Sequence, residues 1–275
     1  MGRFPPPPPF VLSFEIDETT WIDEHLQPWG RVRDTVLVGE IVPSGFEAYA
    51  RVFHPGTRSL GRSPEQSVPL RWSEIAAARG KTVHPEMQLE ALIGDADGLD
   101  DNRWKAISSG GGEWFPPYET LEATECLALA NILRGFTASP IDVWFMLWEG
   151  YGDLGPAIEA VPRAMIHPFR SGRPLPPELA GRTPALRHYL VFRGPLDGLA
   201  EWFRWRHDAP NYWWPNDRSW VVATEVDGHS TYVGGSRASI DEIVASPFLE
   251  ALPSALDHSF NGRGDMVSAP GTGDP

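Results

Sequence analysis

The chain has 275 residues and a mass of 30.5 kDa, long enough for one large or two small domains with a substantial core. Hydrophobic residues make up 41% and charged residues 22%, close to the averages of globular proteins, so wholesale disorder is excluded. The formal net charge of −14 repels phosphate backbones and disfavours nucleic-acid binding, and no apolar run is long enough to cross a bilayer.

Cysteine and histidine usage argues against a metal site. The single cysteine, Cys126, excludes an intramolecular disulfide framework and a multi-cysteine metal site. The histidines form no H-x-x-x-H or H-x-H pattern, so neither a metal nor a cofactor is predicted. Prolines occupy residues 5–9, where a signal peptide would be apolar. We therefore expect a soluble cytoplasmic protein that binds neither membranes nor nucleic acids.

Composition shifts divide the chain into a folded body and two ends. Residues 1–33 are predicted to be a proline-rich and acidic extension. Residues 254–275 are rich in glycine, serine, aspartate and proline and are predicted to be a disordered tail. Between them we expect a single α+β domain over 34–253, with a proline-rich soft segment at 168–184. Both ends should be dispensable for folding.

The first elements of this body are a hairpin and two helices. Alternating apolar residues predict strands at 34–41 and 46–53 on either side of a Pro-Ser-Gly turn. A short helix is predicted over 73–79, and a longer one over about 121–136 with an apolar stripe. Cys126 lies on that stripe, so we expect a buried, inert thiol.

The second half of the chain adds strands and helices in alternation. Strands are predicted at 142–149 and 188–193, then a short helix from Asp197, a hairpin of 219–226 with 231–233, and a last helix over 239–245. No crossover of helix length separates the paired strands of either hairpin, which favours antiparallel pairing. The predicted class is α+β, a mixed or antiparallel sheet with helices packed against it.

Two acids end predicted strands on mainly apolar faces. Alternation places Glu149 on the apolar face of its strand and Glu225 on that of another. Burial raises the pKa of a carboxylic acid, which prepares it as a general acid or base. If the strands adjoin, Glu149 and Glu225 would face one cleft, with His229 as a further acid–base group. The alternative is that both acids only mark strand ends, where water begins.

A dense aromatic segment runs from 210 to 218 and supplies the predicted binding residues. Adjacent tryptophans point in different directions, so we expect at least one of them to be accessible. The alternative is a structural plug that covers the edge of the sheet. The predicted binding residues are Tyr212, Trp213, Trp214, Asp217 and Arg218.

Three stretches carry a resemblance to a known family. They are Gly39–Pro55 (GEIVPSGFEAYARVFHP), Trp144–Gly150 (WFMLWEG) and the block from Asn211 to Gly235. On these residues the chain resembles an uncharacterised family of hypothetical proteins from actinobacterial genomes, over roughly residues 34–253. The resemblance implies no particular activity.

The leading functional hypothesis is therefore a non-enzymatic module that binds a partner protein or a small ligand through a tryptophan-rich surface. Its acidity favours basic partners. One alternative is a hydrolase that uses Glu149, Glu225 and His229 in acid–base roles, because paired carboxyl groups perform such chemistry. A purely structural subunit is a third hypothesis.

Overall fold

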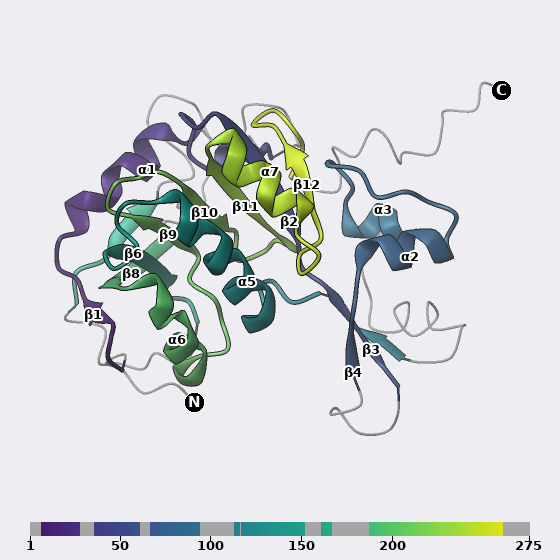
Figure 1. Cartoon of the computed structure of the whole chain (residues 1–275), viewed down its shortest axis with the longest axis horizontal. Coiled ribbons are helices and arrows are strands. Elements are labelled where there is room, and N and C mark those ends of the chain that lie inside the picture. Colours follow the sequence, from purple (N-terminus) through teal and green to yellow (C-terminus); the bar gives the residue numbers. More distant parts are fainter. Residues whose placement is uncertain are drawn as a thin grey trace, which may run out of the picture.

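The computed structural model describes residues 7–27, 36–60, 67–93, 113–115, 117–151, 161–166 and 187–260. Within them, nine antiparallel strands form the main sheet (Figure 1). Its order is β1 (Val11–Leu12), β8 (Arg187–Gly194), β6 (Val143–Trp148), β9 (Tyr212–Pro215), β10 (Val221–Thr224), β11 (Ser230–Gly235), β2 (Ala48–Phe53) and β12 (Ala251–Ser254), with β7 (Ala164–Ile166) also paired to β8.

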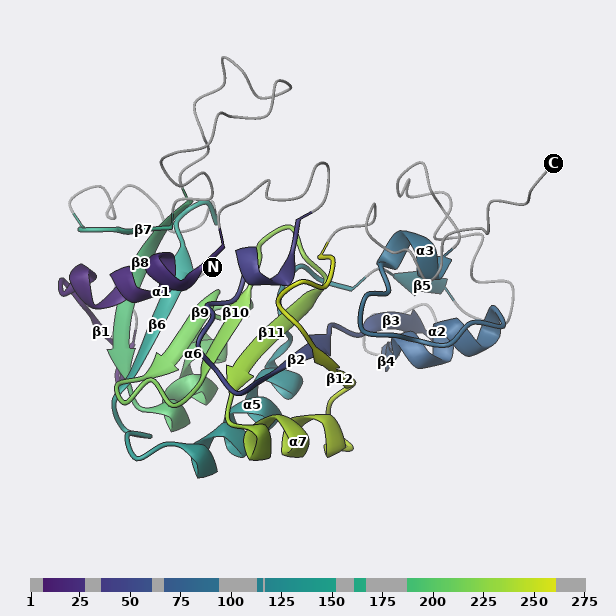
Figure 2. The same cartoon turned by 90° about the horizontal axis from the view of Figure 1, so that it is seen from above.

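Both faces of this sheet are covered (Figure 2). One face packs against α5 (Ala123–Leu133), α6 (Leu199–Trp205) and α7 (Arg237–Ala245), and the short 3-10 turns η4 (Arg134–Phe136) and η7 (Leu196–Gly198) adjoin α5 and α6. The other face packs against α1 (Thr20–His25) and the 3-10 turns η1 (Ile16–Thr19) and η2 (Val38–Glu40). Strands buried on both faces need apolar residues at every position, as in the Val-Trp-Phe-Met-Leu-Trp sequence of β6.

A smaller lobe lies beside the β2–β12 end of the main sheet (Figure 1). It contains β3 (Gly56–Ser59), β4 (Ser67–Leu70) and β5 (Glu113–Phe115), in the order β4-β3-β5, and the helices α2 (Trp72–Ala78) and α3 (Leu89–Ile93). Trp72 anchors this small lobe, because its indole N–H donates to the His54 carbonyl at 2.8 Å. Glu250, next to β12, accepts hydrogen bonds from the first backbone N–H groups of α2, at 2.6 and 2.7 Å.

The α+β class and the antiparallel pairing predicted from the sequence are confirmed, but the first hairpin is wrong. Residues 38–40 form a 3-10 turn, and β2 pairs with β11 and β12. The backbone groups of Gly39 form hydrogen bonds with other segments. Its N–H donates to the Leu256 carbonyl at 2.8 Å, and its carbonyl accepts from the Gln27 N–H at 2.7 Å. These contacts hold the segment on the face of the sheet, where it cannot pair with β2.

The predicted extension at 1–33 is also wrong where the structure describes it, at residues 7–27. Phe10 is only 4% exposed and packs into the core on the face covered by α5, α6 and α7. β1 adds to the edge of β8, while Trp21 and Ile22 of α1 are buried against the opposite face. This segment wraps around the edge of the sheet, so its apolar residues follow no regular period.

The predicted boundary of the C-terminal tail needs a similar correction. Residues 254–260 belong to the fold: the Phe260 N–H donates to the Val36 carbonyl at 2.7 Å, and its ring packs against Tyr232. The rest of the predicted tail, at 261–275, and the predicted soft segment at 168–184 lie outside the described residues.

Candidate functional site

Glu149 lies just past β6, where the backbone still pairs with β8. Its N–H donates to the His188 carbonyl, and its carboxylate contacts His188 Nδ1 at 2.9 Å and Arg163 Nε at 2.5 Å. The Glu149 side chain is about a quarter exposed. It belongs to a small cluster of charged and polar side chains at the end of β6.

Glu225 follows β10 and is almost completely buried. Its carboxylate lies 2.5 Å from an Arg187 guanidinium nitrogen, which also contacts Asp227 at 2.7 Å. Burial raises the pKa of Glu225 to about 7; Asp227 adds to the shift, while Arg187 and nearby backbone N–H groups oppose it. Glu225 therefore has the raised pKa expected from the sequence.

The two acids nevertheless lie on opposite faces of the sheet, so the hypothesis that they face one cleft is wrong. Trp213 lies between its cross-strand neighbours Phe145 and Val222, and all three pack on the face covered by α5, α6 and α7. Glu149 follows Phe145 by an even number of residues and keeps that face, whereas Glu225 follows Val222 by an odd number and takes the other. Alternation within each strand was right; the register through β9 was not visible in the sequence.

His229, the third acid–base candidate, lies in the turn between β10 and β11. Its carbonyl accepts a hydrogen bond from the N–H of His54 at 3.1 Å; burial lowers the pKa of the His54 ring, and His229 adds a smaller electrostatic contribution. The described contacts of His229 are therefore with His54, and they do not connect it to Glu149 or Glu225.

The aromatic segment is an interior strand, which corrects the prediction of an accessible surface there. Tyr212, Trp213 and Trp214 lie in β9 between β6 and β10, and none is more than 2% exposed. Trp213 points to one covered face and Trp214 to the other, so neither reaches the solvent. A binding surface built from these three aromatic rings is excluded.

Asp217 and Arg218 are exposed, and both have structural contacts. The Asp217 carboxylate accepts hydrogen bonds from the Ala138 N–H at 2.7 Å and from the hydroxyl groups of Thr137 and Ser219. Arg218 has a left-handed backbone (φ 52°), and its guanidinium lies 5.3 Å from the Trp21 ring. These residues hold the turn after β9 and the N-terminal segment in place.

A cleft of about 740 Å³ lies between the small lobe and the start of α5. Its walls come from β3, β4, the segment before α5, and the end of α6. They are formed by Thr57, Ser67, Val68, Pro69, Tyr118, Thr120, Glu122, Ala123, Phe203, His207 and Asp208. The lining mixes apolar side chains with polar and charged ones, and a concave site at the junction of two structural units is a common place for a small-molecule binding site.

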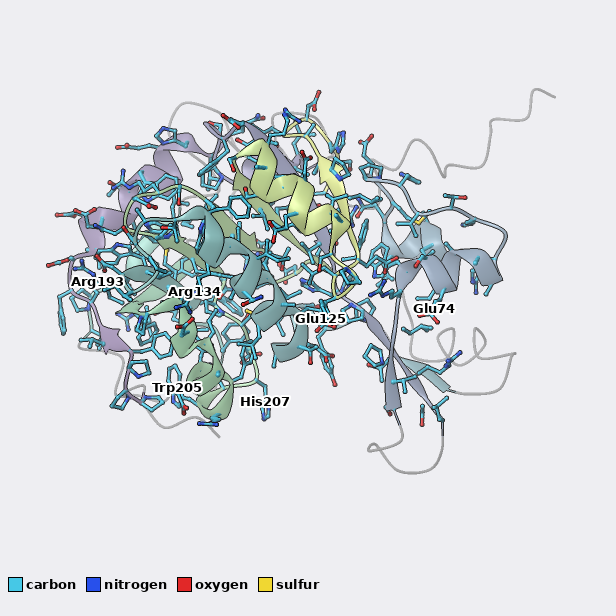
Figure 3. The ribbon with its side chains drawn as sticks, in the orientation of Figure 1. Glu74, Glu125, Arg134, Arg193, Trp205 and His207 are labelled. Atoms are coloured by element: carbon cyan, nitrogen blue, oxygen red, sulfur yellow. The ribbon has the colours of Figure 1, made fainter. Side chains whose placement is uncertain are left out.

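Glu122 supplies an acid to this cleft at the N-terminus of α5. It is half-buried, and no described residue forms an ion pair or a hydrogen bond with its carboxylate. Burial raises its pKa above the ordinary value. Glu125, one turn along α5 (Figure 3), is also buried, and burial together with the charge of Glu122 raises its pKa as well. The two neighbouring acids repel one another beside an open cavity.

Hydrogen bonds fix the wall of the cleft that the end of α6 forms. Asp208 accepts a hydrogen bond from the buried Arg206 guanidinium at 2.8 Å, and its carbonyl accepts from the Trp202 indole at 2.9 Å. The Ala209 N–H donates to the Thr120 hydroxyl at 2.9 Å, which joins the end of α6 to the segment before α5. These contacts fix the cleft on the side of the main sheet.

Sequence reasoning missed this cleft for a physical reason. Acids in the first turn of a helix are common, because they favour the positive end of the helix dipole. Glu122 and Glu125 therefore carry no signal that separates a ligand site from ordinary helix stabilisation. Only the fold brings β4, α5 and α6 together.

Comparisons with known proteins identify no relative: no family model, no curated protein and no solved structure matches the chain. In the part of the chain that the structure describes, no cluster of three or more histidine, cysteine or acidic side chains is placed to hold a metal ion. None of the described helices has the length and apolar character needed to cross a bilayer.

Proposed function

We propose that the protein is a binding module that takes a small, positively charged ligand in the cleft between the small lobe and α5. The observation that carries this proposal is Glu122, an acid with no described partner whose pKa is raised by burial beside a cavity of about 740 Å³. A cation placed there would form an ion pair with its carboxylate. The binding role expected from the sequence is kept, and its place moves from the aromatic segment to this cleft.

The lining of the cleft fits a cation carried on a flat or apolar body. Tyr118 is 62% exposed, and with Phe203 it offers aromatic rings on which a cation or a flat group can stack. The hydroxyl groups of Thr57 and Ser67 offer hydrogen bonds from the small lobe. A ligand of this kind would contact both structural units at once.

The hydrolase alternative depended on Glu149 and Glu225 acting as a pair. Their positions on opposite faces of the sheet leave no observation in the described residues that favours a shared site. The cleft proposal uses neither acid.

Matched probes test this proposal. Benzamidine carries an amidinium on an aromatic ring, and benzamide is its neutral analogue of nearly the same shape. Each is titrated into the full-length protein by NMR or calorimetry, in the wild type and in the variants Glu122→Gln and Glu119→Gln. Glu119 is an exposed acid just before α5 that does not line the cleft, so its variant controls for overall charge.

We expect benzamidine to bind the wild type and Glu119→Gln alike, and benzamide to bind neither strongly. Glu122→Gln should weaken benzamidine binding about tenfold or more, the usual effect of losing a charge-assisted hydrogen bond. Equal loss in both variants would assign the effect to net charge, and failure of benzamidine to bind the wild type would remove the support for a cationic ligand.

A further inference from the structure

A second surface lies at the β1 edge of the main sheet. β1 is the last strand in the sheet order, and within the described residues no strand pairs with its outer side. Val11 lies opposite Arg193, and the Ser13 N–H donates to the Val191 carbonyl at 2.8 Å, so these backbone groups face β8. In an antiparallel ladder the backbone groups of the residue between them, Leu12, then face outward.

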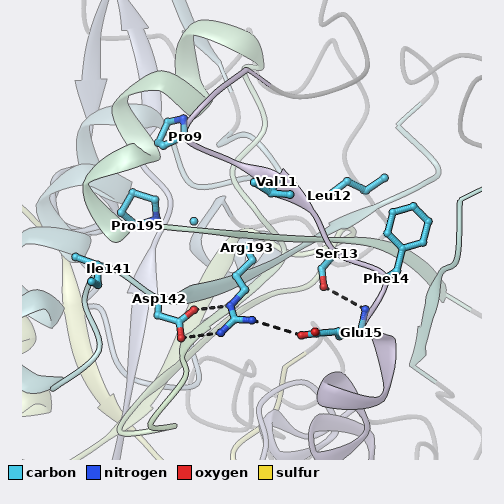
Figure 4. Close-up of a pocket in the computed structure, with 11 residues that line it drawn as sticks. Pro9, Val11, Leu12, Ser13, Phe14, Glu15, Ile141, Asp142, Arg193 and Pro195 are labelled. Carbon is cyan, nitrogen blue, oxygen red and sulfur yellow. Dashed lines mark hydrogen bonds and ion pairs between the residues drawn. The ribbon is translucent and has the colours of Figure 1, made fainter.

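Exposed apolar side chains gather at this edge. Val11 is 67% exposed, Phe14 63% and Ile141 78%, and all three line a groove of about 770 Å³ (Figure 4). Large apolar side chains that are exposed together mark contact surfaces more often than isolated ones do. A strand edge that pairs with no described strand and carries exposed apolar side chains offers an added strand both backbone hydrogen bonds and side-chain contacts.

The charges around the groove select the kind of partner. Arg193 is held by Asp142, at 2.5 and 2.8 Å, and lies 3.4 Å from Glu15 (Figure 4). Glu15 is largely exposed, and Asp17 and Glu18 continue the acidic surface into η1, where Glu18 also contacts Arg218 at 3.3 Å. Acids therefore outnumber bases at this edge, in a chain whose net charge is −14.

We infer that this edge, which we call the β1 groove, docks an extended segment of a partner protein in which basic residues alternate with apolar ones. The segment adds a strand to the outer side of β1, placing apolar side chains against Val11 and Phe14 and basic side chains near Glu15. A second copy of this chain fits less well, because it would bring the same acids to the contact.

The test uses a short, blocked, fluorescent peptide of alternating lysine and valine. Its binding to the full-length protein is followed by anisotropy at low ionic strength, in the wild type, Phe14→Ser and Phe248→Ser. Phe248 is also exposed and lies outside the groove, so the two variants match in chemistry and leave the net charge unchanged. The same peptide with alternate backbone nitrogens methylated tests for strand addition, and a glutamate–valine peptide tests for charge.

We expect Phe14→Ser to weaken binding of the lysine–valine peptide about tenfold, and Phe248→Ser to leave it unchanged. The methylated and acidic peptides should bind at least about tenfold more weakly to the wild type. Equal affinity in both phenylalanine variants would overturn the proposal in favour of unspecific attraction to an acidic protein. Sedimentation that detects a wild-type dimer broken by Phe14→Ser would overturn it in favour of a second copy.

Discussion

Glu225 links the stability of the fold to pH. Burial raises its pKa from an ordinary value of 4.5 to about 7, so the folded chain keeps a proton that the unfolded chain releases. Its contribution to stability is fully present below pH 4.5 and is lost as the pH rises through about 7. Glu225→Gln should remove about 3 kcal/mol of this pH dependence. Urea unfolding across this range checks it; parallel pH profiles of variant and wild type would contradict it.

His54 acts in the opposite direction. Its Nδ1 lies 2.8 Å from the Tyr118 carbonyl and its Nε2 lies 2.9 Å from the Thr231 hydroxyl, so the geometry assigns the proton to Nδ1. Burial lowers the pKa of the ring to about 3, and the stability that the neutral form contributes is present above pH 6.5 and lost as the pH falls toward 3.

The replacement His54→Gln tests this linkage. The variant should be less stable at neutral pH, because it loses a buried hydrogen-bonded ring. Between pH 6.5 and 5 its free energy of unfolding should fall less steeply than that of the wild type, by about 1 kcal/mol per pH unit. Denaturant unfolding at several pH values measures both slopes, and identical slopes would show that His54 does not carry the effect.

At the level of elements, the N-terminal segment offers a matched pair of phenylalanines. Phe10 is 4% exposed, and its ring centroid lies 5.2 Å from that of Phe145 and 5.1 Å from that of Trp202. Phe14 is 63% exposed. We expect Phe10→Ala to lower the free energy of unfolding by about 3–5 kcal/mol. Phe14→Ala should change it by less than about 0.5 kcal/mol. Chemical denaturation compares the two, and similar small losses would mean that residues 7–27 are dispensable after all.

Strands and helices with a clear period could be predicted, and irregular ones could not. The apolar run of β6 predicted a strand, and the stripe over 121–136 predicted α5 with η4. β9 has the same two-faced apolar character, but prolines flank its three aromatic residues and favour a loop. The last helix begins slightly earlier than the predicted 239–245: Ser236 caps it, because its hydroxyl accepts from the Ser239 N–H at 3.2 Å.

At the level of the whole molecule, the sequence could predict the class and the acidity but not the candidate site. The cleft joins residues of β3, β4, the segment before α5 and the end of α6, which are far apart in the chain and meet only because the small lobe lies beside α5. Glu149 and Glu225 were plausible partners because each ends a strand on an apolar face. Their separation follows from the register of β9 between β6 and β10, and no local pattern records that register.

The most direct test of the cationic-ligand proposal is the pKa of Glu122 itself, measured by NMR of its carboxyl carbon in the full-length protein. In the free protein, burial should hold this pKa above the ordinary value, and saturation with benzamidine should lower it because a bound cation favours the carboxylate. Benzamide should leave the pKa of Glu122 unchanged. If the Glu122 resonance titrates identically with and without benzamidine, no cation binds beside it, and the account of the cleft is wrong.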